Sequence, residues 1–103
     1  MATYSSLCNS FNGLEVPLLT VGNLESKDVI IISARVHPGE TVSSLIAEGF
    51  IKELVSDGDV GRVLRDKFLI KIVPMLNPDG VSRGNYRFSG YGCDLNRKWK
   101  SCK

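Results

Sequence analysis

The sequence predicts a single α/β domain, and three observations lead to this fold class. Two apolar, β-branched segments, 16–21 and 29–36, have the length and composition of strands. A third segment, 68–76, is almost continuously apolar, which is typical of a strand buried on both faces. Between the last two, residues 40–56 carry apolar side chains at steps of three and four, as in a helix with one buried face. The order strand, helix, strand predicts a parallel pair joined by a right-handed crossover. The helical face expected to be buried consists of Leu45, Ile46, Phe50, Ile51, Leu54 and Val55.

The other segments predict connections and ends rather than further strands. With 103 residues, no internal repeat and no linker rich in Pro, Gly or Ser, the chain has room for one small domain. Residues 1–15 are expected to be a short lead, and residues 16–103 to form the domain. The turn-prone stretch GNLESKD suggests that the first two strands pair as neighbours. A short helical turn is expected at 60–65, and a loop from Asn77 onward.

Charge and cysteine content exclude several classes of function. Thirteen basic and 11 acidic residues give a net charge of +2, too small and too scattered to indicate nucleic-acid binding. Cys8, Cys93 and Cys102 have neither a zinc-finger nor a disulfide-framework spacing, so we expect reduced thiols. The start of the chain does not resemble a signal peptide, and the longest apolar run, 29–32, cannot span a bilayer. We therefore expect a soluble protein of the cytosol with no membrane partner.

A histidine and a glutamate follow the second predicted strand, three residues apart. His37 is the single histidine of the chain, and a tight turn at 38–39 would bring it near Glu40, so that both could bind one zinc ion. A purely structural interpretation also holds: Pro-Gly ends the strand and Glu40 favours the positive end of the next helix. The carboxyl ends of strands are where open α/β sheets bind ligands, and His37 and Asn77 both fall there.

The stretch PMLNPDGVSRGNYRF, residues 74–88, predicts a turn followed by a basic loop. Pro78 and Gly80 suit a type I turn, which is the structural interpretation of this stretch. The loop that follows carries Arg83 and Arg87.

The stretch DLNR, residues 94–97, offers groups that suit a carboxylate ligand. Asn96 supplies an amide and the adjacent Arg97 a planar guanidinium, whose N–H groups can donate two parallel hydrogen bonds to a carboxylate. The simplest role of Asp94 is to cap a short helix.

The motifs HPGE, NPDG, GNYR and DLNR follow apolar strands in one order, and this order resembles the zinc metallocarboxypeptidase family. The residues of these motifs, with DLNR extended to DLNRKW, are similar to those of the cytosolic carboxypeptidase branch. The resemblance extends from Val16 to Trp99, less than half of such a catalytic domain. It implies part of a three-layer αβα domain with a mixed sheet, whose C-terminal half lies outside the chain.

The resemblance also implies a role for each motif. His37 and Glu40 would be the first two ligands of one catalytic zinc ion, and the family's third ligand, a second histidine, is absent from the chain. Arg87 would stabilise the oxyanion that forms at the scissile carbonyl. Asn96 and Arg97 would hold the terminal carboxylate of a peptide or protein substrate.

Several family features are missing from these 103 residues. The general-base glutamate is absent, because Glu48 and Glu53 are better explained as the solvent face of the helix. Gly39 stands where digestive relatives have an arginine, and Arg83 has no implied role beyond surface charge. The resemblance also stops abruptly at SCK, which suggests a partial sequence, a splice product or a truncated gene model. We expect the isolated chain to be inactive.

Three hypotheses for function follow. The first is a fragment of a zinc carboxypeptidase that trims C-terminal residues, by the resemblance often glutamates from acidic tails such as those of tubulin. The second is a fragment of an aspartoacylase-like zinc amidohydrolase, which also combines His-x-x-Glu with DLNR but tends to have Phe-Pro-Gly after it, where this chain has residues 98–99, Lys-Trp. The third is a non-catalytic fragment that binds zinc or a partner weakly.

Overall fold

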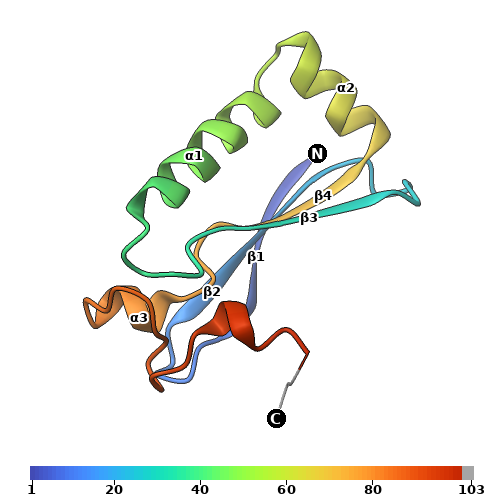
Figure 1. Cartoon of the computed structure of the whole chain (residues 1–103). Helices are drawn as coiled ribbons and strands as arrows, with labels where there is room; N and C mark the ends of the chain where they lie inside the picture. Colours follow the sequence, from blue (N-terminus) through green and yellow to red (C-terminus); the bar gives the residue numbers. More distant parts are fainter. Residues whose placement is uncertain (101–103) are drawn as a thin grey trace.

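The computed structural model describes residues 1–100 and contains one mixed sheet of four strands. The strands lie in the order β1-β2-β4-β3 (Figure 1). β1 and β2 are antiparallel, as are β2 and β4, whereas β3 and β4 are parallel. The predicted α/β class and the predicted parallel pair are therefore confirmed. The bounds are β1 Ala2–Asn9, β2 Glu15–Gly22, β3 Val29–Ser33 and β4 Leu69–Val73.

The helices follow the prediction in the middle of the chain and depart from it near the end. The long helix α1, Thr41–Val55, agrees with the predicted 40–56. The turn expected at 60–65 is a longer helix, α2, Asp59–Lys67, with nine residues. The region beyond Asn77 was expected to be loop only, and this is wrong, because it contains two short helices. They are α3, Pro78–Ser82, and the 3-10 helix η1, Leu95–Arg97.

The strand β1 was not predicted, because residues 1–15 were expected to be a lead. Every side chain of β1 is exposed, so the strand has no alternating apolar pattern to reveal it. Its backbone pairs with β2 from Ala2 opposite Val21 to Asn9 opposite Glu15. Backbone hydrogen bonds to β2 therefore form this edge strand, although none of its side chains is buried.

The first two predicted strands, β2 and β3, are not neighbours, and that prediction is wrong. β4 lies between them, with Ile72 paired to Leu19 on one side and to Ile32 on the other. The connection at 23–28 has to cross two strand spacings, about 10 Å, which six residues can span. It runs past the start of β4, since the Leu69 N–H donates to the Asp28 carbonyl at 3.1 Å.

The core lies between the sheet and one layer of helices. α1 and α2 lie on the same side of the sheet (Figure 1). Only part of the predicted helical face is buried: Leu54 is buried, whereas Leu45 is 67% exposed and Ile46 66% exposed. The described residues therefore supply the sheet and one helical layer of the expected partial three-layer domain. The buried core residues are Val21, Leu54, Ile70 and Ile72, with Leu19, Ile30, Ile32, Phe50, Ile51, Leu64 and Phe68 packed against them.

The carboxyl ends of β3 and β4 meet at one end of the sheet. There the turn before α1 lies near α3 and η1 (Figure 1). The Asn77 side-chain amide donates to the Val36 carbonyl at 3.0 Å, which ties the two strand ends together. No helix within residues 1–100 is long and apolar enough to cross a membrane.

Candidate functional site

The turn that follows β3 brings His37 and Glu40 together. His37 is 8% exposed, and its Nδ1 lies 3.1 Å from Glu40 Oε1. The Glu40 N–H donates to the His37 carbonyl at 3.2 Å, which closes the turn. The side chain of Glu40 is 54% exposed, so its carboxylate is open to solvent, whereas the His37 ring is mostly buried.

Asp94 holds the other side of the histidine ring. Its Oδ1 lies 2.9 Å from His37 Nε2, and its Oδ2 accepts from Arg87 Nε at 2.7 Å. The hydrogen bond with His37, followed by those from Arg87 and the Asn96 backbone, lowers the pKa of Asp94 to about 2, although desolvation opposes this shift. The carboxylate is therefore ionised and positions the histidine ring.

The sequence predicted only a capping role for Asp94, and that role is present as well. Its Oδ1 accepts from the Asn96 N–H at 3.0 Å at the start of η1. The contact with His37 was missed because 57 positions separate the two residues. The available signal was weak: Asp94 is one of two carboxylates after Asn77, the other being Asp79.

The positions of His37 Nδ1 and the Glu40 carboxylate would suit a cation bound between them. If Nε2–H of His37 donates a hydrogen bond to the ionised Asp94, the neutral ring has no proton on Nδ1. Its Nδ1 then directs a lone pair toward the Glu40 carboxylate. Two acceptors 3.1 Å apart need a proton or a metal ion between them. Two ligands at ~2 Å from one zinc ion with a tetrahedral angle lie ~3.3 Å apart, close to this separation.

The described residues supply only part of a metal site. Within residues 1–100 there is no group of three or more His, Cys, Asp or Glu side chains that could hold a metal ion. Cys8 and Cys93 are free, and Cys102 lies outside the described residues. A zinc ion on His37 and Glu40 therefore requires ligands from outside this part of the chain.

The predicted oxyanion residue and the two predicted substrate-binding residues are placed differently from one another. Arg87 reaches the histidine through Asp94. Asn96 and Arg97 are exposed on η1, two and three positions after Asp94 in the chain. Asn96 Oδ1 accepts from Trp99 Nε1 at 2.7 Å, and Arg97 Nη1 donates to the Asn96 carbonyl at 3.3 Å. The structure thus gathers His37, Asp94 and Arg87 and leaves this pair at the exposed rim.

The NPDG and GNYR stretches pack directly on the histidine turn. Asn77 caps α3 by accepting from the Gly80 N–H at 2.9 Å, where a type I turn was the structural interpretation. The Gly39 N–H donates to the Tyr86 carbonyl at 2.7 Å. A Cβ at Gly39 would overlap the Tyr86 ring, so the present packing leaves no room for the arginine that digestive relatives have here.

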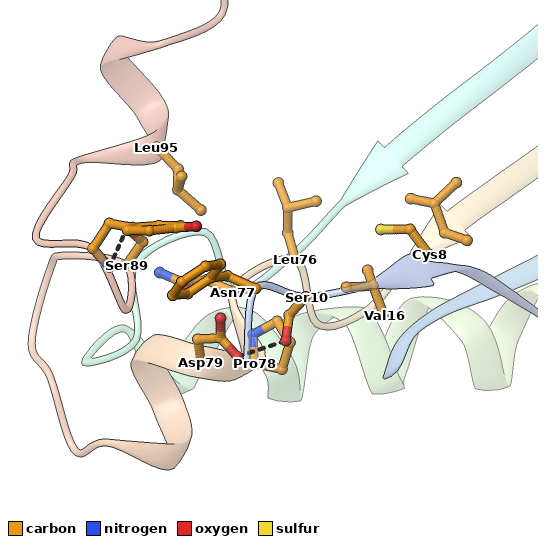
Figure 2. Close-up of a pocket in the computed structure, with 12 residues that line it drawn as sticks. Cys8, Ser10, Val16, Leu76, Asn77, Pro78, Asp79, Ser89 and Leu95 are labelled. Carbon is orange, nitrogen blue, oxygen red and sulfur yellow. Dashed lines mark hydrogen bonds between the residues drawn. The ribbon is translucent and has the colours of Figure 1, made fainter. Parts of the chain in front are cut away.

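Arg83, expected to be surface charge only, ties the site loop to the turn between β1 and β2. Its Nη1 donates to the Gly90 carbonyl at 2.8 Å and its Nη2 to Asn12 Oδ1 at 3.4 Å. The buried Asp79 accepts from Ser10 Oγ at 2.6 Å in the same region. Figure 2 shows Ser10 and Asp79 pointing toward each other. Both residues line a pocket of about 220 Å³. The turn between β1 and β2 therefore contacts both α3 and the loop that carries Arg87.

The described residues thus form an α/β sheet with a histidine–glutamate pair at its strand ends, and Asp94 links this pair to Arg87. The sequence profile of the zinc carboxypeptidase family matches residues 1–102, and the chain belongs to this family. The resemblance and the metallocarboxypeptidase fold expected from the motifs are confirmed. The match includes the residues of β1.

Curated relatives place the chain beside the cytosolic carboxypeptidases. It is 48% identical over 103 residues to cytosolic carboxypeptidase 2 of Xenopus tropicalis, covering 93% of this chain and 11% of the relative. It is 52% identical over 91 residues to cytosolic carboxypeptidase 6 of Mus musculus, covering 82% of this chain and 17% of the relative. The chain thus spans less than a fifth of the length of these relatives.

Solved structures share the fold over nearly the whole chain. A metallo-carboxypeptidase from Burkholderia cenocepacia has a TM-score of 0.89 and 37% identity, covering 99% of this chain and 29% of that one. A metallo-carboxypeptidase from Pseudomonas aeruginosa, in complex with (2-guanidinoethylmercapto)succinic acid, has a TM-score of 0.86 and 32% identity, covering 97% of this chain and 28% of that one. These relatives extend well beyond the segment that this chain matches.

Proposed function

We propose that this chain is part of a zinc-dependent carboxypeptidase that hydrolyses the last peptide bond of peptides or proteins. The observation that carries the proposal is His37, fixed by Asp94 on one ring nitrogen and facing Glu40 with the other. Acidic protein tails, such as glutamates at the C-terminus of tubulin, are the substrate class of the proposal, and the cytosol is its location. Support comes from the cytosolic carboxypeptidases among its relatives.

The residues of the chain would divide the work of peptide hydrolysis. His37 and Glu40 would hold the zinc ion together with a ligand from the rest of the protein, and Asp94 would keep the histidine ring in place. A zinc ion bound there would lower the pKa of a bound water and polarise the scissile carbonyl.

Substrate binding would involve the arginines. Arg87 uses Nε for Asp94, so its terminal N–H groups can donate to the oxyanion at the scissile carbonyl. Asn96 and Arg97 would bind the terminal carboxylate, which selects the last peptide bond for hydrolysis.

The isolated chain should be inactive under this proposal. It offers two zinc ligands where a catalytic site has three protein ligands and a water, and it lacks a general base. Peptide hydrolysis by the purified, zinc-loaded chain would contradict this statement.

The test restores the missing part of the domain. The chain would replace the matching segment of mouse cytosolic carboxypeptidase 6, and release of C-terminal glutamate from a peptide would be measured with and without zinc. We expect zinc-dependent release that His37→Ala abolishes and that Glu48→Gln retains, since Glu48 lies on exposed α1 and bonds to Lys52. Full activity in His37→Ala would overturn the proposal. Cleavage of N-acetyl amino acids instead of peptides would favour an amidohydrolase.

A further inference from the structure

Arg35 has an unusual backbone conformation between two anchored residues. The Ala34 N–H donates to the Val73 carbonyl at 2.9 Å, and the Val36 carbonyl accepts from Asn77 Nδ2 at 3.0 Å. Between these anchors Arg35 has a φ of 56°, and it is the one non-glycine residue with positive φ within residues 1–100. Glycine adopts this region without strain, whereas a residue with a Cβ is disfavoured there. A side chain kept at such a position indicates that the side chain contributes something glycine cannot.

The side chain of Arg35 spans the whole turn that carries the histidine–glutamate pair. Its Nε donates to the Pro38 carbonyl at 2.8 Å, in the middle of the turn. Its Nη1 donates to Ser44 Oγ at 2.9 Å, in the first turn of α1. Its backbone N–H donates to Ser43 Oγ at 3.0 Å. One residue therefore connects the end of β3, the turn and the start of α1.

The start of α1 lacks a side-chain cap, and Arg35 contacts it instead through two serine hydroxyls. The N-cap residue is Glu40, and its side chain makes no capping hydrogen bond. Glu40 Oε1 instead lies 3.1 Å from His37 Nδ1. Arg35 thus contacts both serines of the first helical turn, on either side of which the His37–Glu40 turn and the body of α1 lie.

We propose that Arg35 is the positioning residue of the His37–Glu40 pair, acting through the Pro38 carbonyl and Ser44. The purpose of the pair rests on the proposed function, whereas the positioning itself does not. The planar guanidinium suits this role, because it presents N–H groups in fixed directions to two acceptors at once. Arg35 is not proposed to touch zinc or substrate.

The test uses His37, the single histidine of the chain, as a reporter. Selective ¹⁵N labelling of histidine gives one pair of ring signals, measured in the metal-free 103-residue chain. In the wild type we expect an observable Nε2 proton, because Asp94 lies 2.9 Å from Nε2 and slows its exchange. In Arg35→Ala we expect this proton signal to be lost and the ring ¹⁵N shifts to move to those of free histidine. The amide signals of β4, recorded on a uniformly ¹⁵N-labelled sample, should stay in place.

Arg35→Gly separates the side chain from the backbone conformation. Glycine adopts the same positive φ without strain, so only the side-chain contacts are removed. We expect Arg35→Gly to lose the Nε2 proton signal as Arg35→Ala does. Wild-type signals in Arg35→Gly would overturn the proposal, because the backbone alone would then fix the turn.

Two further variants complete the test. Ser44→Ala removes one acceptor and leaves Arg35 unchanged, so we expect a smaller shift of the His37 signals in the same direction. Arg62→Ala is the matched control. Arg62 lies on α2, away from the histidine turn, and its Nη2 also donates to a backbone carbonyl, that of Asp57, at 2.6 Å. An equal shift in Arg62→Ala, or none in Ser44→Ala, would overturn the proposal. Because the readout needs neither zinc nor activity, its failure is distinct from failure of the proposed function.

Discussion

Asp94 shows how much of the site depends on a single carboxylate. It accepts hydrogen bonds from His37, from Arg87 and from the Asn96 backbone, and so connects the turn after β3 with the loop that precedes η1. Its ordinary pKa of 3.8 falls to about 2, with the His37 hydrogen bond as the largest cause. The folded state therefore favours the ionised form.

The lowered pKa of Asp94 predicts how stability changes with pH. Because the folded-state pKa lies below the unfolded value, the stabilisation is present above the unfolded pKa of 3.8 and is lost as the pH falls toward 2. Asp94→Asn lacks this ionisation. We expect the urea midpoint of the metal-free wild type to exceed that of Asp94→Asn at pH 6, and the two to converge near pH 2. A gap that stays constant from pH 6 to pH 2 would contradict the prediction.

Gly80 and Gly49 predict opposite effects of one added methyl group. A Cβ at Gly80 would overlap Pro38 and lie 2.7 Å from the Phe88 carbonyl oxygen. We expect Gly80→Ala to lower the free energy of unfolding by about 1–3 kcal/mol. A Cβ at Gly49, within α1, meets nothing within 4 Å, so Gly49→Ala should raise it by about 0.5–1 kcal/mol. Urea unfolding of both variants checks this, and equal effects would show that crowding at Gly80 is absent.

At the scale of elements, β4 is the strand on which the core depends. It pairs with β2 on one side and β3 on the other, and its Ile72 is completely buried. We expect Ile72→Ala to cost about 2–5 kcal/mol of unfolding free energy. Ile31→Ala on β3 is the matched control, because Ile31 is 73% exposed and its truncation should change stability by less than about 0.5 kcal/mol. Similar losses in the two variants, measured by urea unfolding, would be inconsistent with this core.

Elements with a strong period were predictable from the sequence, and contacts between distant elements were not. α1 follows from its three- and four-residue steps, and the parallel β3–β4 pair follows from the helix between them. β1 was not predictable, because all its side chains are exposed and show no apolar alternation. The position of β4 between β2 and β3 was not predictable either, because strand order is not encoded in the residues of any one segment.

The same limit applies to the site. His37 and Glu40 were predictable because three positions separate them. Asp94 was not, since it lies 57 positions after His37 in the chain. Arg35 was not singled out either, because its role depends on a backbone angle that the residue type does not reveal.

At the scale of the whole molecule, the chain exposes apolar surface that a complete domain would be expected to cover. Leu45 is 67% exposed and Ile46 66% exposed on α1. Exposed apolar patches promote association in water. We expect the isolated chain to self-associate with rising concentration, and the double substitution Leu45→Lys, Ile46→Lys to reduce this association. Sedimentation velocity over a range of concentrations measures it, and a monodisperse monomer for the wild type would refute the expectation.

The strand order also has a consequence for synthesis on the ribosome. Within residues 1–100, β4 emerges after the other three strands, yet it occupies the interior of their sheet. A nascent chain that ends before β4 can form the β1–β2 hairpin, but β3 then has no partner strand within residues 1–100. Until residue 73 leaves the exit tunnel, β4 cannot form, and the apolar side chains of β3 and α1 stay exposed to solvent. We expect a chaperone to bind the nascent chain during this interval.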